Sequence, residues 1–364
     1  MLNTMQISHT TGSIIFFTVF VVISTAAIAY VIAWIGRKIR RQKAPRRSSL
    51  GKWTRRDVLS LAGGGVACIG WGALFEPYRL EVTRTRIVSP KLRGAQRPVR
   101  IVHISDMHCD PKIRNETRLP GMISRLSPDL IVYTGDSINS LGGLNNFQHC
   151  LTQIAEIAPT YASRGNWDTY FGPVDYFGDT GAIELDGNNR PIDVAGTHLW
   201  VAGAAVLDPQ TPFPAADVLD RALAGIPEED FKVFLYHYPD LIYSLADRGV
   251  NLHCAGHTHG GQVALPFYGA LMTVSKFGKR FEAGLYPIPQ NQPQPDTHLY
   301  INRGIGMEGR APRVRFCCRP EVSLIEIAPP ESLTTENTEI VGATATGNDN
   351  GFLNHGNSSS DDNN

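Results

Sequence analysis

The sequence predicts an α/β fold in which largely parallel strands are covered by helices. Short apolar runs alternate with stretches of helical length between residues 78 and 328, and this strand-helix-strand order is typical of a parallel sheet with helices on its faces. In addition, unusual clusters of polar residues stand directly after the expected strands. The region holds about 250 residues, which is the size of one large domain.

The segments that precede this domain indicate attachment to a membrane. Residues 13–35 form a run of 23 residues without a charged side chain, and about 20 apolar residues in a helix suffice to cross a hydrocarbon core. The segment that follows, 36–56, contains ten basic residues and no acidic one. The positive-inside rule places such a loop in the cytoplasm and the short N-terminus outside.

A second apolar stretch, 58–75, directly follows the basic loop. It contains five glycines, so it is a weak membrane helix by hydropathy alone. The preceding Thr54-Arg55-Arg56-Asp57-Val58-Leu59 resembles a twin-arginine export signal, although a chance arginine pair beside a membrane-surface helix would look the same. Residues 1–77 are therefore expected to anchor the domain at the cytoplasmic membrane, on its outer face.

Six strands and three helices are expected inside the domain. The strands lie at 100–105, 129–134, 160–163, 199–204, 232–236 and 251–255, and the helices at 116–126, 147–157 and 239–246. The strands are short runs rich in apolar residues, such as Leu-Ile-Val-Tyr at 130–133. Pro120 marks an early turn or the start of the first helix, because proline fits the first helical turn.

Composition sets limits on the rest of the chain. The formal net charge is zero, so no global basic field points to nucleic acid. Six scattered cysteines are too few for a disulfide scaffold, and the adjacent Cys317 and Cys318 are interpreted as buried apolar residues. The segment 329–364 is rich in Thr, Asn, Ser, Gly and Asp, so it cannot offset the entropy of ordering and is expected to be disordered.

The polar clusters all follow the C-terminal ends of expected strands. They are Asp106-Met107-His108, Gly135-Asp136, Gly165-Asn166-Trp167-Asp168, His237-Tyr238-Pro239-Asp240 and Gly256-His257-Thr258-His259-Gly260-Gly261-Gln262. In open α/β sheets, ligands bind outside the carboxyl ends of the strands, where the loops converge. The candidate metal ligands in these loops are Asp106, His108, Asp136, Asn166, His237, His257 and His259.

These donors favour a site for two metal ions. Oxygen and imidazole ligands without thiolate suit Mn, Fe or Zn. One ion takes about four to six donors, so seven donors suggest two divalent ions that share a bridging carboxylate. Paired ions acidify a shared water, orient a phosphate ester and neutralise the charge that develops during hydrolysis at phosphorus. Each motif is common by itself, and it is their joint occurrence at strand ends that carries the interpretation.

The ordered series of motifs resembles the calcineurin-like metallophosphoesterases. That family carries D-x-H, G-D, G-N, a single His and G-H-x-H, and all five occur here in that order. The longer forms HYPD at 237–240 and GHTHGGQ at 256–262, together with YINRGIG at 300–306 and PEV at 320–322, resemble one bacterial subgroup of membrane-anchored or twin-arginine-exported phosphodiesterases. The resemblance covers roughly residues 75–328.

The resemblance implies a fold and a set of roles. The family fold is a four-layer αββα sandwich of two mixed sheets flanked by helices, here preceded by transmembrane segments. Carried over by motif, Asp106, His108 and His259 would bind one metal ion. Asn166, His237 and His257 would bind the other, and Asp136 would bridge the two.

The chain departs from the family pattern at Trp167. Many members have His at this position, where it is thought to protonate the leaving oxygen, and indole cannot deliver a proton near neutral pH. One interpretation is that Trp167 packs or binds substrate while another group, such as Asp168, replaces the acid. The other is that the leaving group is already a stable anion, as in a phosphoanhydride or an aryl ester. Family branches that cut UDP-diacylglucosamine also lack this His.

The sequence thus predicts a metal-dependent hydrolase of a phosphate ester or anhydride. The expected substrate is a phosphorylated small molecule or lipid of the cell envelope, and a UDP-2,3-diacylglucosamine-like pyrophosphate fits. One alternative is a catalytically weak relative that binds phosphate, although its ligand set is complete. Another is a nuclease, but the domain shows no basic patch with interleaved aromatic residues, so nucleic acid is a disfavoured partner.

Overall fold

A computed structural model describes residues 55–330, except 93, 209, 212, 290–295 and 310–312. The chain divides into two units, Met1–Pro329 and Pro330–Asn364, and the fold below is that of the first unit. The expected span at 13–35, the loop at 36–56 apart from its last two residues, and the tail beyond residue 330 lie outside the described residues. The domain limits therefore stay predictions.

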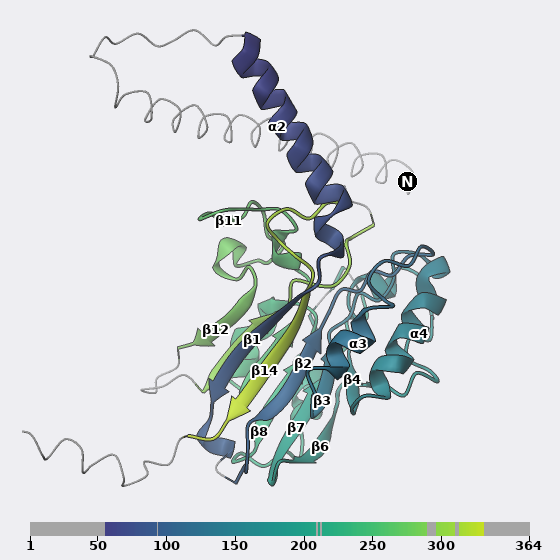
Figure 1. Ribbon diagram of the computed structural model, residues 1–364. Helices are drawn as coiled ribbons and strands as arrows, with labels where there is room; N and C mark the ends of the chain where they lie inside the picture. Colours follow the sequence, from purple (N-terminus) through teal and green to yellow (C-terminus); the bar gives the residue numbers. More distant parts are fainter. Residues whose placement is uncertain are drawn as a thin grey trace, which may run out of the picture. The chain divides into compact units, whose positions relative to one another are not determined.

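The described chain folds as a mixed α/β sandwich with two large mixed sheets. The first is six-stranded, in the order β1 (Glu81–Val88), β14 (Glu321–Ala328), β2 (Val99–Ile104), β3 (Leu130–Tyr133), β4 (Thr160–Ala162) and β5 (Ile183–Glu184). Only its β14–β2 pair is antiparallel. Figure 1 shows β14 lying between β1 and β2.

The second six-stranded sheet follows the order β12 (Gly284–Ile288), β13 (Thr297–Ile301), β9 (Leu252–Ala255), β8 (Phe231–Leu235), β7 (Thr197–Gly203) and β6 (Asn188–Val194). Its two outer pairs are antiparallel, and its three central pairs are parallel. A separate hairpin consists of β10 (Ala264–Leu265) and β11 (Gly269–Ala270).

Helices and short 3₁₀ turns connect these strands. The α-helices described are α2 (Arg55–Leu74), α3 (Leu119–Ser124), α4 (Leu144–Ala155), α5 (Ala216–Leu223) and α6 (Ile242–Ala246). The 3₁₀ turns are η1 (Glu76–Tyr78), η2 (Pro90–Leu92), η3 (Leu141–Gly143), η4 (Trp167–Thr169), η5 (Pro239–Leu241), η6 (His259–Gly261) and η7 (Gly278–Arg280).

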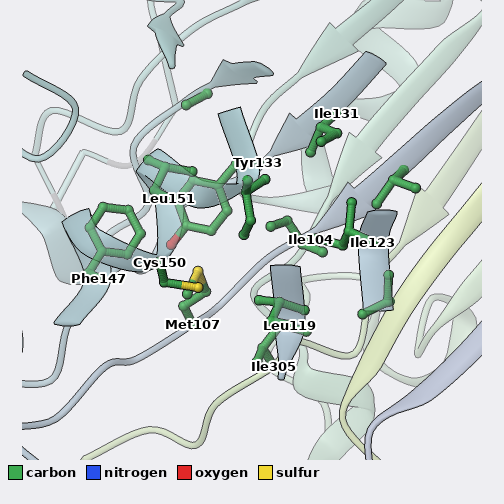
Figure 2. Packing of buried hydrophobic residues seen from close by; sticks show 14 of the residues in the cluster. Ile104, Met107, Leu119, Ile123, Ile131, Tyr133, Phe147, Cys150, Leu151 and Ile305 are labelled. Atoms are coloured by element: carbon green, nitrogen blue, oxygen red, sulfur yellow. The ribbon is translucent and has the colours of Figure 1, made fainter. Parts of the chain in front are cut away.

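The alternation of side chains along the strands builds the layers. In β2, Ile101 packs into the cluster shared by the two sheets, whereas Val102 and Ile104 face α3 and α4. Figure 2 shows this second cluster, in which Ile104 and Tyr133 of the sheet meet Leu151 and other helix residues. The second sheet alternates in the same way, and its Phe234 packs with residues of α5 and α6. Each sheet is thus apolar on both faces, which explains the continuous apolar runs in the sequence.

The expected elements are confirmed, with small shifts at their ends. The six strands correspond to β2, β3, β4, β7, β8 and β9, and the three helices to α3, α4 and η5 with α6. Pro120 stands in the first turn of α3, as expected for a proline at a helix start. The strands that were not predicted are mostly at sheet edges or carry many polar residues, as in β1 and β6.

The apolar stretch 58–75 coincides with α2 and the residue after it. Within the described residues, no helix has the combination of length and hydropathy needed to cross a membrane. Several large apolar side chains of α2 are exposed, among them Leu59, Val66 and Leu74.

Candidate metal centre

The candidate ligands stand on loops that leave the carboxyl ends of neighbouring strands. Asp106 and His108 follow β2, Asp136 follows β3, and His257 and His259 follow β9. All five have a left-handed backbone, with φ between 42° and 68°. This conformation is unfavourable for residues with a Cβ atom, and it recurs at functional sites where the surrounding structure holds it in place.

Four of these side chains form a buried cluster at the centre of the site. One potential ligand atom from each of Asp106, His108, Asp136 and His259 lies within 4.8 Å of those of the others. The Nε2 atoms of His108 and His259 are 3.2 Å apart. His259 Nε2 lies 3.3 Å from Asp106 Oδ1, and His108 Nε2 lies 3.5 Å from Asp136 Oδ2. Two carboxylates and two imidazoles therefore converge on one point.

His237, from the loop after β8, extends this cluster on the Asp136 side. Its Nδ1 lies 2.6 Å from the carbonyl oxygen of Thr134, so Nδ1–H donates to that carbonyl and the lone pair is left on Nε2. That Nε2 lies 3.3 Å from Asp136 Oδ2 and 3.9 Å from Asp106 Oδ1. A backbone acceptor that fixes the tautomer of an imidazole in this way is a common feature of metal-binding histidines.

His257 and Asn166 lie next to this group. The His257 ring centroid is 5.1 Å from that of His237, and the His257 backbone N–H donates to the Asp106 carboxylate at 3.2 Å. Asn166 is 9% exposed, and the backbone N–H of the next residue, Trp167, donates to Asp136 Oδ1 at 2.8 Å. The structure thus brings all seven expected side chains into one region, with Asp136 between the two groups.

Electrostatics favour the metal-binding form for some of these side chains and oppose it for others. Burial lowers the pKa of His108 to about 4 and that of His257 to about 3, so both imidazoles are neutral at physiological pH. Burial raises the pKa of Asp106 to about 7, which opposes its ionised form. Burial also disfavours the charged form of His237, but the Asp136 carboxylate outweighs it and raises the pKa of His237 to about 9. Burial also opposes ionisation of Asp136, but the neighbouring His237 outweighs it and lowers the pKa of Asp136 to about 2. Metal binding requires neutral histidine and ionised carboxylate.

The pattern of hydrogen bonding also fits a bound cation. His237 Nε2 and Asn166 Oδ1 are buried atoms without a hydrogen-bond partner in the described chain. Buried polar atoms without a partner are costly and rare, and they often belong to groups that bind an ion. An imidazole nitrogen that carries no hydrogen can donate a lone pair to a metal ion. The side-chain oxygen of Asn166 always has a lone pair to donate. This donor set therefore suits a metal ion.

Comparisons with known proteins agree with this chemistry. A family model described as calcineurin-like phosphoesterase matches residues 99–261. The uncharacterized metallophosphoesterase YkuE of Bacillus subtilis is 30% identical over 280 residues, which cover 73% of this chain and 91% of YkuE. The chain belongs to the calcineurin-like phosphoesterase family.

Two further relatives of this phosphoesterase carry the names of enzymes. The UDP-2,3-diacylglucosamine pyrophosphatase LpxG of Chlamydia trachomatis is 28% identical over 309 residues, which cover 70% of this chain and 91% of LpxG. The phosphodiesterase YaeI of Escherichia coli is 28% identical over 298 residues, which cover 75% of this chain and 99% of YaeI. The protein is accordingly a metal-dependent phosphoester hydrolase.

Asp168, the candidate replacement for the missing acid, has a different role in this phosphoesterase. Its carboxylate is buried and accepts three backbone N–H groups, from Asp136 at 2.9 Å, Ser137 at 2.8 Å and Gly165 at 2.8 Å. It therefore joins the loop after β3 to the loop after β4. These three bonds give Asp168 a role in positioning the Asp136 loop.

Trp167 lies directly against the cluster. The indole is 6% exposed, and its ring meets the edge of His108 at 5.3 Å and 87° between planes. On its other side it meets Tyr170 at 5.7 Å. The position that many family members fill with His is therefore filled here by a large apolar ring in contact with a candidate ligand.

The structure also settles several secondary expectations. Arg303 pairs with Glu321 at 2.8 Å and Glu81 at 3.0 Å, so it is a structural arginine. Cys318 is buried as expected, and its thiol donates to the His259 carbonyl at 3.1 Å. Cys317 is exposed, so its assignment as a buried residue was wrong. The turn that separates the two side chains has a left-handed Cys317.

Sequence reasoning missed supporting residues around the ligands. Asn139 Nδ2 donates to the His108 carbonyl at 2.9 Å and to the Met307 carbonyl at 3.0 Å. Gly304 lies so close to Asp106 that an added Cβ would stand 2.7 Å from the Asp106 Cβ. The YINRGIG motif was a signal for Gly304. No sequence motif indicated Arg315. This residue is fully buried behind the loop and donates hydrogen bonds to the loop's carbonyls.

Proposed function

We propose that the protein is a two-metal phosphoesterase that hydrolyses a lipid-linked phosphate ester or anhydride at the cytoplasmic membrane. The observation that carries this proposal is the buried convergence of Asp106, His108, Asp136 and His259, flanked on the Asp136 side by His237. Seven donors divided around one central carboxylate suit two Mn, Fe or Zn ions better than one.

The seven side chains would divide into two groups. Asp106, His108 and His259 hold one ion and contact one another through their ligand atoms. His237, His257 and Asn166 would hold the second. Asp136 would serve both, because its Oδ2 lies near His108 on one side and near His237 on the other. Two bound ions supply an acidified water and charge neutralisation for displacement at phosphorus.

The chain's own residues prepare this site for the reaction. The Thr134 carbonyl holds His237 with Nε2 toward Asp136, and Asp168 fixes the backbone on both sides of the bridge. Trp167 covers His108 with an apolar ring, which excludes water from that face. These residues keep the donors in position before substrate arrives, so little reorganisation is required during turnover.

Two relatives support the substrate class. LpxG is named for a pyrophosphate bond in a diacylated sugar nucleotide, and YaeI is named a phosphodiesterase. We propose a substrate of the same kind, a phosphodiester or pyrophosphate with a lipid part, and we place this chain in the membrane-anchored or twin-arginine-exported subgroup. Trp167 supports a good leaving group, because a general acid adds little when the departing oxygen is already a stable anion.

An activity panel on the full chain tests the proposal. The purified protein is stripped of metal with a chelator, reloaded with Mn, Fe or Zn, and assayed on a phosphodiester, an alkyl monoester and a nucleotide-linked lipid pyrophosphate. We expect metal-dependent cleavage of the diester and the pyrophosphate and slow cleavage of the monoester. Turnover that survives complete metal removal would refute the two-metal site. Metal binding without cleavage of any of the three would instead indicate a phosphate-binding relative.

A further inference from the structure

The segment 263–281, which contains β10 and β11, carries an unusual set of exposed apolar side chains. Phe267 at its tip is 111% exposed and has a left-handed φ of 67°. Tyr268, Met272 and Val274 are 57%, 52% and 55% exposed. A cluster of large exposed apolar side chains is uncommon on soluble surfaces and usually marks an interaction site. We call residues 263–281 the hairpin segment.

The hairpin segment is also basic. It contains Lys276, Lys279 and Arg280 and no acidic residue, although Glu282, directly after it, forms an ion pair with Lys279. Lys279 lies 4.3 Å from the centroid of the Tyr268 ring and donates to the carbonyl of Ala270, and Lys276 lies 4.8 Å from the ring of Phe213. Exposed aromatic and aliphatic side chains beside lysine and arginine are the composition of surfaces that sit in the headgroup region of anionic membranes.

Hydrogen bonds connect the hairpin segment to the end of α2. The Gly72 carbonyl of α2 accepts the Arg315 N–H at 2.9 Å. The next residue, Phe316, exchanges backbone bonds with the base of the hairpin, from Phe316 N to the Gln262 carbonyl at 3.0 Å and from Ala264 N to the Phe316 carbonyl at 2.8 Å. The two elements therefore share one connecting segment, and Figure 1 shows β11 near the lower end of α2.

The same end of α2 is apolar and exposed. Trp71, Leu74 and Phe75 are 43%, 68% and 57% exposed. The chain that precedes α2 is the segment expected to enter the membrane. A bilayer would cover the exposed apolar side chains of the hairpin segment and of this end of α2, and the basic residues of the hairpin segment suit anionic lipid.

We propose that the hairpin segment is a second membrane contact, in which Phe267 and its apolar neighbours insert into the headgroup region of an anionic bilayer. The contact lies next to the metal centre. Ligand His259 opens η6, which leads into β10, and an added Cβ on Gly261 would stand 2.5 Å from the Ala270 Cβ. Insertion would thus hold the ligand loop close to the lipid surface, where a lipid-linked phosphate resides. This last consequence rests on the proposed hydrolysis of a lipid-linked phosphate, whereas the contact itself rests on the proposed membrane attachment alone.

Tryptophan fluorescence tests the contact directly. The full chain is reconstituted in vesicles of phosphatidylcholine with phosphatidylglycerol, and Phe267→Trp is compared with the parent, which has five tryptophans. Val88→Trp is the matched control, because Val88 is 55% exposed and ends β1 about 23 Å along the strand from Glu81. We expect the added fluorescence at 267 to be blue-shifted and quenched by brominated lipid, and that at 88 to be neither. Equal quenching at the two positions would overturn the proposal.

An activity comparison tests the consequence. The double variant Phe267→Ser with Tyr268→Ser removes the apolar tip and leaves every candidate ligand unchanged. We expect about tenfold slower hydrolysis of a phosphodiester lipid presented in the same vesicles, with hydrolysis of soluble bis(p-nitrophenyl) phosphate unchanged. Loss of activity on both substrates would mean that the tip supports the site itself and not the membrane contact. Quenching at 267 without hydrolysis by the parent would leave the contact standing and reject the proposed function.

A protein partner is the competing occupant of this surface. In that case Phe267→Trp would stay unquenched in vesicles of lipid alone, and the added fluorescence would shift only when membrane protein extract is present. Replacing phosphatidylglycerol by phosphatidylcholine further distinguishes a membrane contact from a protein partner. For the membrane contact, this replacement should weaken quenching at 267, because the basic residues lose their anionic counterpart.

Discussion

At the scale of single residues, Asp136 contacts candidate ligands of both groups. Its carboxylate accepts the Trp167 backbone N–H and lies near the Nε2 atoms of His108 and His237. It is therefore the residue whose replacement should disturb both halves of the centre at once. An asparagine keeps the shape and one acceptor oxygen but removes the charge and the second ligand oxygen.

We expect Asp136→Asn to lose bound metal and to hydrolyse diesters more than about 100-fold more slowly. Elemental analysis and turnover measured on the same preparation check this. The matched control is Asp217→Asn, because the Asp217 carboxylate is 76% exposed on α5 and its replacement should change neither value. Two metal ions per chain with near-normal turnover in Asp136→Asn would contradict the bridging role.

Trp167 leads to a second prediction at this scale. If the leaving group needs no proton, Trp167→His should raise hydrolysis of alkyl esters by about tenfold or more and hydrolysis of pyrophosphates much less. Metal content should stay the same, because no candidate ligand changes. The measurement is the rate across esters whose leaving groups differ in pKa. An equal change for all substrates would mean that Trp167 packs or binds substrate and that another group supplies the proton.

At the scale of elements, the site depends on how closely two strand-end loops approach. Gly165 follows β4, and a Cβ added there would stand 2.2 Å from Asp136 Oδ1 and 2.6 Å from the Asp136 backbone nitrogen. We expect Gly165→Ala to lower the free energy of unfolding by at least about 2 kcal/mol and to weaken metal binding.

Gly121→Ala serves as the matched control for this effect. Its Cβ would meet no atom closer than 3.8 Å, from the flexible Arg125 side chain, and it lies inside α3. Alanine is favoured over glycine in a helix, so this variant should be as stable as the parent or slightly more so. Thermal unfolding and metal titration of both variants give the comparison. Similar losses in the two would mean that close loop packing is not what the site requires.

The strand-end motifs made the site predictable at the level of elements. Asp106, Asp136 and His257 could be placed together because each follows an apolar run, and parallel runs end at the same edge of a sheet. The roles of Thr134 and Asn139 could not be predicted from the sequence. Thr134 acts through its backbone carbonyl and Asn139 through a supporting amide, and neither contribution has a sequence motif. Asp168 was found by its position, but its bonding to three backbone N–H groups depends on loops that are distant in sequence.

At the scale of the whole molecule, two core histidines couple stability to pH. His103 and His253 are both buried with one hydrogen bond each, to Thr134 Oγ1 and to the Tyr236 carbonyl. Burial lowers the pKa of each to about 3. The unfolded chain therefore binds protons below about pH 6.5 that the folded chain does not, so these groups reduce stability as the pH falls from 6.5 toward 3.

Each buried histidine should cost about 2 kcal/mol of stability between about pH 7 and about pH 5. His253→Gln removes one titrating group, so the variant should lose about 2 kcal/mol less than the parent over this interval, whatever its stability at neutral pH. Denaturant unfolding of the metal-free protein at the two pH values provides the measurement. Parallel pH profiles for parent and variant would mean that His253 takes up its proton in the folded state.

The anchor prediction also belongs to this scale. If the basic loop and Arg55-Arg56 orient the chain as expected, protease added to intact spheroplasts should digest the domain. Digestion only after lysis would place the domain in the cytoplasm, with a cytosolic lipid nucleotide as the better substrate candidate. A cytoplasmic marker protein, intact before lysis, is the control.

The pairing of strands into two sheets was beyond sequence reasoning. β2 and β3 were visible as apolar runs, but β1 carries four consecutive polar or charged residues at 83–86, and half of its residues are only partly buried. The antiparallel β14–β2 pair places Ser323 opposite His103. No local sequence pattern indicates pairing between residues that are so far apart in the sequence. The family resemblance supplied the two-sheet expectation that periodicity could not.

The position of β14 has a consequence for how the protein is made. β14 enters the first sheet between β1 and β2, with Glu321 opposite Glu81, so the earliest strands of the domain receive their partner from its last. During synthesis on the ribosome, the edges of β1 and β2 that pair with β14 stay unpaired until nearly all of the domain has been translated. Open edges can pair with other chains. The nascent protein is therefore most exposed to aggregation in the interval just before β14 emerges, and the end of translation coincides with the closing of the fold.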